Sequence, residues 1–167
     1  YLYQLGHRKI AYLGVDNSLV FSADRRNGYQ LALTRHGIVP KPEYCVELPS
    51  ITAGEDTPVH ALLRSASRPT AIVVSDDILA LTLERICTET GLSIPADLSI
   101  LSFNNSLFAR LTSPQLTSID INSCQLGMEA AAQMISHIEN PGLPATKILV
   151  PHQLIERDSC ARPASHE

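Results

Sequence analysis

The sequence predicts an α/β fold in which a parallel sheet is covered by helices on both faces. Short apolar runs rich in β-forming residues alternate with longer segments whose apolar residues recur at helical spacing. The segments between successive runs are long enough for the right-handed crossovers that connect parallel strands. The length of 167 residues fits one domain, or one domain with a partial second, and is ample for a buried core.

The first half of the chain contains three expected strand–helix pairs. The strands are expected at 9–14, 44–48 and 70–74, and the helices at 22–35, 57–67 and from the turn at 75–77 to 90. Ser22 is a suitable N-cap for the first helix, and Asp24 falls in its first turn. Gly37 and Gly91 follow the first and third helices, where a left-handed residue commonly ends a helix.

The second half is expected to add strands at 98–103 and 116–121, followed by a helix that ends at 139. Asn122 and Gln125 have the spacing of a capping box at the start of that helix. Its apolar face is expected to comprise Leu126, Ala130, Met134 and Ile138. Two short strands are expected at 148–150 and 153–156, and the tail from 161 to 167 is expected to be disordered.

Composition excludes several classes of protein. A formal net charge of −4 without any Lys/Arg cluster argues against nucleic-acid binding by this chain itself, although a further module could bind DNA. The four cysteines are widely spaced, which favours free thiols in a reducing cytoplasm over a metal site or disulfide framework. No signal peptide or membrane-length apolar run is present. The first residues, YLYQLG, are typical of the last turn of a helix that starts upstream, so we expect a fragment.

Polar residues follow two of the predicted strands and mark a candidate site. Asp76 and Asp77 come after the third strand, and Asn104 and Asn105 after the fourth. In open α/β sheets, ligands bind at the carboxyl ends of the strands. Helix capping, binding of ligand hydroxyls, and catalysis or metal binding are all open to the aspartate pair. The asparagines are neither acids nor bases, so the set favours hydrogen bonding over catalysis.

Arg25, in the first turn of the first complete helix, is expected to face the same edge of the sheet. Its rigid fork of donors suits vicinal hydroxyls or a carboxylate, and its alternative role is that of a surface arginine, as for Arg26 and Arg157. The six histidines lack metal-ligand spacing and are expected in loops or on the surface. No nucleophile elbow, P-loop or dinucleotide fingerprint is present, so no enzyme, metal or cofactor is expected.

Eight short stretches, in order, resemble the ligand-binding core of bacterial LacI/GalR-type transcriptional regulators. They are LGHRKIAYLG, RRNGYQLAL, HGI, PTAIVVSDDILAL, IPADLSILSFNNS, SPQLTSIDI, LG and LIERDSC, and together they extend from Leu5 to Cys160. The SFNNS loop and LTSIDI are most similar to the maltose operon repressor subgroup.

The resemblance implies a periplasmic-binding-protein-like core of two α/β subdomains with an effector in the cleft between them. Residues 1–121 would form most of the C-terminal subdomain, and 122–145 would be a crossover strand end and helix belonging to the N-terminal subdomain. Residues 146–160 would return to the C-terminal subdomain, and 161–167 would be the tail.

The resemblance also implies a set of effector-binding residues. The arginine of the family's RxxG motif falls on Arg25. The family usually has Asn-Asp after the third strand and an Asp after the fourth, whereas this chain has Asp76-Asp77 and Asn104. The amide and the carboxylate have exchanged places, which keeps polyol binding possible and leaves the particular sugar open. Asn122 and Ser123 match the cleft hinge, where Ser123 supplies no aromatic platform, and Asp77 and Asn105 are further cleft candidates.

The function implied is the effector-binding part of a DNA-binding repressor in the cytoplasm. A small-molecule effector, expected to be a saccharide, would shift the population of closed states and thereby change operator affinity. The operator would be bound by a helix-turn-helix outside this chain, and a homodimer is implied. Two rivals are a secreted sugar-binding protein of a transporter and an enzyme that uses Asp76 and Asp77 on a phosphate or glycoside.

Overall fold

The computed structural model of the chain describes residues 1–15, 20–49 and 57–164. Six strands form one sheet in the order β2-β1-β3-β4-β5-β6. The strands are β1 (Ile10–Val15), β2 (Cys45–Leu48), β3 (Ala71–Val74), β4 (Ser99–Phe103), β5 (Thr117–Asp120) and β6 (Gln153–Ile155). All neighbouring pairs are parallel except β5 and β6, which are antiparallel. The predicted fold class is confirmed, with one antiparallel edge strand added.

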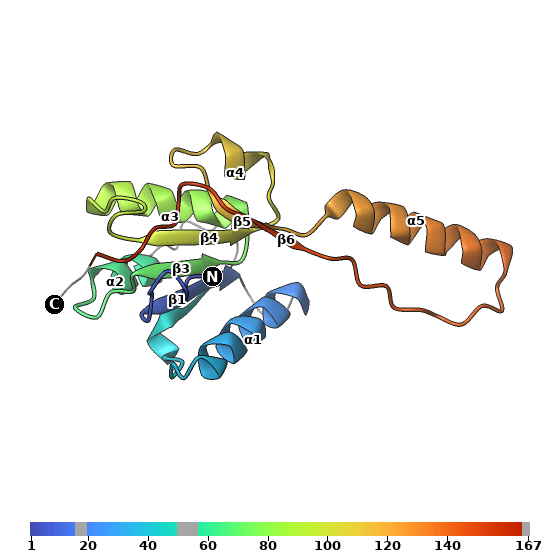
Figure 1. Cartoon of the computed structure of the whole chain (residues 1–167), viewed down its shortest axis with the longest axis horizontal. Coiled ribbons are helices and arrows are strands. Elements are labelled where there is room, and N and C mark those ends of the chain that lie inside the picture. Colours follow the sequence, from blue (N-terminus) through green and yellow to red (C-terminus); the bar gives the residue numbers. More distant parts are fainter. Residues whose placement is uncertain (16–19, 50–56, 165–167) are drawn as a thin grey trace.

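One face of the sheet is covered by three helices, α2 (Thr57–Arg64), α3 (Asp77–Thr90) and α4 (Leu107–Leu111) (Figure 1). This face holds the larger core, in which Leu13, Ile72 and Ile100 of adjacent strands pack with Leu79 and Leu83 of α3. Since successive side chains of a strand point to opposite faces, the buried strands carry apolar residues at almost every position.

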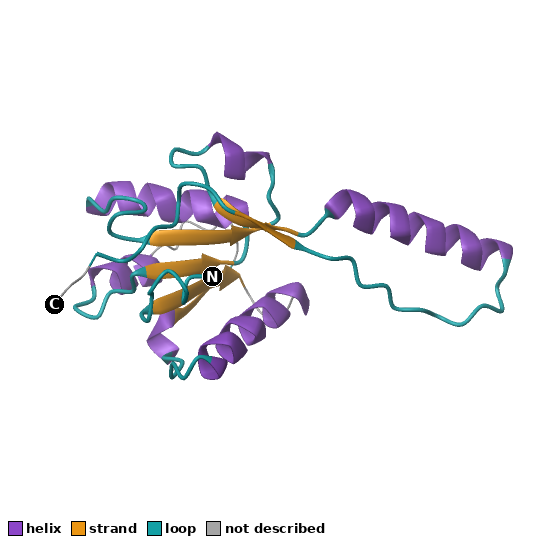
Figure 2. Cartoon of the chain, in the orientation of Figure 1, coloured by secondary structure: helices purple, strands orange, loops and turns teal. Residues whose placement is uncertain are grey.

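The opposite face is covered by one helix of the sheet body, α1 (Val20–Arg35) (Figure 2). Tyr29 and Leu33 of this helix pack in a smaller core. Helices on both faces were predicted, but α1 begins earlier than the predicted start at Ser22. Ser22 lies inside the helix instead of capping it, because its buried hydroxyl donates to the carbonyl of Val15 at 2.6 Å. A short 3-10 helix, Pro42–Tyr44, then precedes β2.

Residues 1–6 form a helical turn at the edge of this second face. The backbone N–H of Leu5 donates to Tyr1, that of Gly6 to Tyr3 and that of His7 to Leu2, with Gly6 at φ +106°. These bonds have the pattern of a Schellman helix end. His7 is buried, with its ring nitrogens 2.8 Å from Thr70 Oγ1 and 2.9 Å from the carbonyl of Ala161, so the prediction of loop or surface histidines is wrong for this residue.

The start of the tail is ordered against β4, contrary to the prediction for 161–167. Ser99 Oγ and the backbone of Ala161 exchange hydrogen bonds of 3.1 and 3.0 Å. The last three residues of the tail lie outside the described part of the chain. The buried hydroxyl of Ser159 extends the attachment by donating to Ile100 O at 2.5 Å.

Helix α5 (Ser123–Glu139) projects away from the sheet and is joined to it only through β5 and β6 (Figure 1). It buries none of its residues, and Leu126, Met134 and Ile138 are 41%, 64% and 70% exposed. The predicted capping box is wrong, because the Asn122 side chain makes no capping bond and Gln125 Nε2 donates to Glu129 instead. Residues 148–150 belong to no strand, so the strand predicted there is wrong too.

Candidate functional site

The candidate site lies at the carboxyl edge of the sheet, where β3 and β4 end beside the first turns of α1. β1, β3 and β4 are parallel neighbours, so the residues that follow them meet at one edge. Asp76 directly precedes α3, and Asn104 directly follows β4. Arg25 reaches this edge from α1.

Arg25, Asn104 and Asp76 form one continuous chain of hydrogen bonds, here called the edge network. Arg25 donates through one guanidinium nitrogen to Asn104 Oδ1 at 3.0 Å and through the other to the backbone carbonyl of Ser75. Asn104 Nδ2 donates to Asp76 Oδ2 at 2.6 Å. The three residues predicted to lie together are therefore in direct contact, although they are separated by up to 79 positions in the sequence.

Arg25 is flanked by two aromatic rings in addition to its polar partners. Its guanidinium carbon lies 4.5 Å from the ring centroid of Phe103 and 5.1 Å from that of Phe21. Burial lowers the pKa of Arg25, and the nearby Asp76 opposes that shift. The two aromatic rings, together with the oxygen atoms of Ser75 and Asn104, hold the guanidinium in one place. This restraint pre-organises its remaining N–H donors.

Asp76 and Asp77 have different roles in the structure. Asp76 caps α3, because its Oδ1 accepts from the backbone N–H of Ile78 at 2.7 Å. Asp77, a cleft candidate in the sequence, does not cap the helix; it is 1% exposed and lies beneath the edge. Asp77 Oδ1 accepts from the hydroxyls of Ser102 at 2.5 Å and Ser118 at 2.8 Å, and Oδ2 from the N–H of Ser106 at 2.6 Å.

This arrangement gives Asp77 a structural role as the centre of a buried polar cluster. Its carboxylate joins the start of α3 to β4, β5 and the start of α4. A carboxylate enclosed in this way makes no contact with a molecule in solution. We therefore assign Asp77 to the scaffold of the site and Asp76 to its surface.

Asn105 is the second residue of the loop after β4, and its side chain points away from the edge network. Asn104 and Asn105 both have positive φ, at +97° and +48°, which asparagine tolerates better than other side chains do. Asn105 Nδ2 donates to Asp120 at the end of β5, whereas its Oδ1 accepts from Arg157 beyond β6. Asn105 therefore contacts the last residue of β5 and the segment that follows β6.

Asn122 and Ser123 stand where the chain leaves the sheet for α5. Asn122 is exposed, has φ +54°, and donates its backbone N–H to Asp120 Oδ1 at 2.7 Å. Ser123 is the exposed first residue of α5. No side-chain contact brings either residue to the edge network, so their role stays a prediction.

Arg157 and Asp120 were missed by sequence reasoning. Arg157 was interpreted as a surface arginine, yet it is partly buried and donates to Leu116 O at 2.7 Å and to Asn105 Oδ1 at 2.5 Å. The hydrogen bond from Asn105 lowers the pKa of Asp120. The only available signal was their position, since both residues stand at the ends of predicted edge strands where polar side chains of different loops meet.

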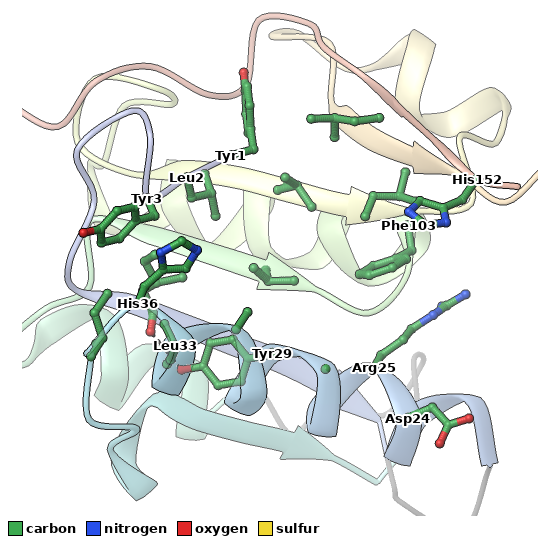
Figure 3. Close-up of a pocket in the computed structure, with 18 residues that line it drawn as sticks. Tyr1, Leu2, Tyr3, Asp24, Arg25, Tyr29, Leu33, His36, Phe103 and His152 are labelled. Carbon is green, nitrogen blue, oxygen red and sulfur yellow. Dashed lines mark hydrogen bonds between the residues drawn. The ribbon is translucent and has the colours of Figure 1, made fainter.

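A groove of about 890 Å³ extends from the edge network across the face of the sheet that carries α1 (Figure 3). Arg25, Asp24 and Phe103 lie at one end of it, and Tyr3 and His36 stack with ring centroids 4.2 Å apart at the other. Its lining is mainly apolar. Such a groove suits the rings of a ligand or a protein segment, with polar recognition confined to the end that carries Arg25.

The described residues contain no group of three or more side chains suited to hold a metal ion, and none of their helices is long and apolar enough to cross a membrane. All four cysteines are free thiols. The chemistry of the site is that of hydrogen-bond donors and acceptors: one guanidinium, one carboxylate and one amide.

Comparisons with known proteins agree with this description. Residues 1–160 match the family model for the periplasmic binding protein-like domain. The chain is 32% identical over 140 residues to the ribose operon repressor of Haemophilus influenzae, a match covering 84% of this chain and 42% of the relative. It is 29% identical over 155 residues to catabolite control protein A of Priestia megaterium, covering 92% and 47%. The chain thus spans about half the length of these curated relatives.

Two solved structures extend the comparison to three dimensions. A LacI-type transcriptional regulator from Bacillus cereus has a TM-score of 0.90 and 36% identity, covering 97% of this chain and 57% of the other. A sugar-binding regulator of the LacI family from Escherichia coli, in complex with phosphate, has a TM-score of 0.84 and 27% identity, covering 97% and 58%. These matches place Arg25, Asp76 and Asn104 within a fold of known type. The chain belongs to the periplasmic binding protein-like domain family, in the form found in LacI-type transcriptional regulators.

Proposed function

We propose that this chain is the effector-binding part of a LacI-type DNA-binding repressor, and that its effector is a saccharide held at the edge network. The observation that carries this proposal is the hydrogen-bonded chain from Arg25 through Asn104 to Asp76. It offers donors and acceptors side by side, which is the pattern that sugar hydroxyls require. The sugar-binding relative in Escherichia coli and the ribose operon repressor support the same class of ligand.

The exchange of amide and carboxylate between positions 76 and 104 determines which hydrogen-bond donors and acceptors are free for the ligand. Asp76 already accepts from Ile78 and Asn104, and Asn104 already accepts from Arg25. Each oxygen retains a second lone pair, and Arg25 and Asn104 retain N–H groups, so a polyol can bind without breaking the network. Maltose is one candidate, through the SFNNS and LTSIDI resemblance, and ribose is another.

The subdomain assignment is part of the proposal. Residues 1–121 and 146–160 form the C-terminal subdomain, 122–145 belong to the N-terminal one, and 161–167 are the tail. The support is that α5 buries no side chain against the sheet while keeping large apolar residues exposed, as expected of a helix that packs on another body. The effector would then close the cleft between the two subdomains and change operator affinity.

A homodimer in the cytoplasm completes the proposal. Exposed apolar side chains gather on α4 and at the start of α3: Leu107 is 60% exposed, Leu111 70% and Ile78 42%. Such a patch on a regulator suits a second copy of the chain. The site residues act by binding alone, without catalysis. Sedimentation equilibrium of the wild type and of Leu111→Glu tests the dimer, because the charge should produce monomers if this patch is the interface.

Calorimetry on the full product of the gene tests the effector proposal. Maltose and ribose are titrated into the wild type, into Asn104→Gly, which keeps the backbone conformation accessible, and into the control Asn140→Gly at the exposed end of α5. One sugar should bind the wild type and the control equally, and about 10 to 100 times more weakly to Asn104→Gly, since a hydrogen bond to a charged network contributes about 1.5–3 kcal/mol. Binding that is unaffected by Asn104→Gly would remove the edge network from the site.

A further inference from the structure

Two stretches of chain connect α5 to the sheet, and they leave it side by side. The outgoing connection is 121–122 after β5, and the returning connection is 140–152 before β6. β5 and β6 lie side by side (Figure 1) and pair in antiparallel fashion, with Asp120 opposite Gln153. Any movement of α5 relative to the sheet must therefore bend the chain next to these two strand ends.

Three side chains link the end of β5 and the loop after β4 to the segment that follows β6, at the end of that strand remote from α5. Arg157 donates to Asn105 Oδ1 at 2.5 Å, and Asn105 Nδ2 donates to Asp120 Oδ2 at 2.9 Å. Asp120 Oδ1 accepts from the backbone N–H of Asn122, the residue that directly precedes α5. Arg157 is anchored in addition by the carbonyl of Leu116.

Asn105 has every polar group of its side chain in use, and its backbone N–H donates to the buried hydroxyl of Ser118 at 3.0 Å. Ser118 in turn donates to Asp77, so Asn105 is fastened to the scaffold beneath the edge as well. A side chain bonded on all sides has one rotamer available and transmits displacement instead of absorbing it.

Asn104, its immediate neighbour, belongs to the edge network. The two asparagines share one peptide unit and both have positive φ, which costs a non-glycine residue about 1–2 kcal/mol. Two strained residues in succession persist only where the surrounding bonds determine them. Asn104 is held by Arg25 and Asp76, and Asn105 by Asp120 and Arg157, so a rotation of their common peptide moves both sets.

We propose that Asn105, Asp120 and Arg157 form a hinge clamp, a set of positioning residues that fastens the outgoing connection of α5 and the segment after β6 to the loop carrying Asn104. Contact at Asn104 is thereby transmitted to the outgoing connection through the shared peptide. The clamp itself is independent of any ligand; its use in effector response rests on the function proposed above. None of the three residues needs to touch the effector.

Hydrogen exchange of the 167-residue chain tests the clamp without a ligand. Arg157→Met removes the fork while keeping an apolar stem, Asn105→Gly keeps the positive φ, and Arg64→Met on the exposed end of α2 is the matched control. Both clamp variants should speed exchange at least tenfold in 117–123 and in 153–157, with β3 and the control unchanged. If Arg157→Met loosens only 153–157, the cross-link between β5 and the segment after β6 does not exist and the proposal is overturned.

A double-mutant comparison tests transmission from the edge network. Asn104→Gly should raise exchange at 117–123 at least threefold in the wild-type background and by less than 1.5-fold in the Asn105→Gly background. Equal effects in both backgrounds would show that Asn104 acts on the connections by another route and would overturn the transmission step. Asn140→Gly controls for the loss of an amide elsewhere.

The effector arm uses the full gene product with ribose and with maltose as probes. A sugar that binds should change exchange at 117–123 in the wild type, whereas Asn105→Gly should retain its affinity within threefold and lose that change. Retention of the change in Asn105→Gly would contradict the clamp. If neither sugar binds the wild type, the proposed saccharide function fails, while the two ligand-free comparisons still decide the clamp.

Discussion

Replacement of Asp77 by alanine is expected to be the most destabilising single change at the carboxyl edge. The substitution removes one buried carboxylate and with it the acceptor of three hydrogen bonds, from Ser102, Ser118 and Ser106. The hydroxyls of Ser102 and Ser118 are in fully buried residues, so water cannot replace the lost acceptor without opening the structure.

The magnitude follows from the number and kind of bonds. A hydrogen bond to a charged group contributes about 1.5–3 kcal/mol, and relief of the desolvation of the carboxylate offsets part of the sum. We expect a loss of about 3–5 kcal/mol in the free energy of unfolding for Asp77→Ala. Asp77→Asn should lose only about 1–2 kcal/mol, because its amide oxygen can accept from the Ser106 N–H while both serine hydroxyls turn to accept from its NH₂ group.

Urea denaturation followed by circular dichroism measures both values, with Glu139→Gln at the exposed end of α5 as the control for loss of a carboxylate. The control should stay within about 0.5 kcal/mol of the wild type. A loss of less than 1 kcal/mol for Asp77→Ala, or equal losses for alanine and asparagine, would refute the role of Asp77 as the centre of the buried cluster.

Three further outcomes are expected. Burial raises the pKa of Glu84 to about 7, so the folded state becomes less stable as the pH rises from 4.5 to 7. With partial solvent screening included, we expect a loss of about 1–2 kcal/mol in the free energy of unfolding. Urea denaturation of Glu84→Gln over the same pH range should lack this decline. Gly6→Ala should lower the melting temperature, because φ is +106° there, whereas Gly28→Ala, inside α1 with open space around it, should raise the melting temperature. Each substitution should change the free energy of unfolding by about 0.5–2 kcal/mol. Maleimide at pH 7.5 should label the exposed Cys124 at least tenfold faster than the other three thiols, whose pKa values burial raises, and Cys124→Ser should remove the fast phase.

Much of the fold followed from local patterns because the strands of a buried parallel sheet are continuous apolar runs. The run before Asp76 could only be a buried strand, and Gly91 ended α3 at the expected residue with φ +73°. Local patterns failed where a tertiary contact competed with them. Ser22 has the chemistry of an N-cap, but the carbonyl of Val15 takes its hydroxyl, so the helix begins two residues earlier.

The meeting of Arg25, Asp76 and Asn104 at one edge was predictable, whereas the hydrogen bonds among them were not. Parallel strand order brings positions 76 and 104 to one edge, and the RxxG resemblance brought in Arg25. Which of two adjacent aspartates turns outward depends on the register of α3 against β4, which no local pattern encodes. Arg157 lies 52 residues from its partner Asn105, and only the antiparallel return of β6 brings them together.

Because β5 and β6 pair with each other, the six strands form a complete sheet without residues 121–152. Both ends of that segment join the sheet at the same place. Asp120 and Gln153 are antiparallel partners, and partners of this kind have Cα atoms about 4.5–5.5 Å apart. A two-residue turn of the Asn-Gly type spans such a pair. The whole excursion is therefore an interchangeable insert: it can be exchanged for a hairpin turn, or for the corresponding segment of another protein, while the strand order, both cores and the edge network keep their covalent framework.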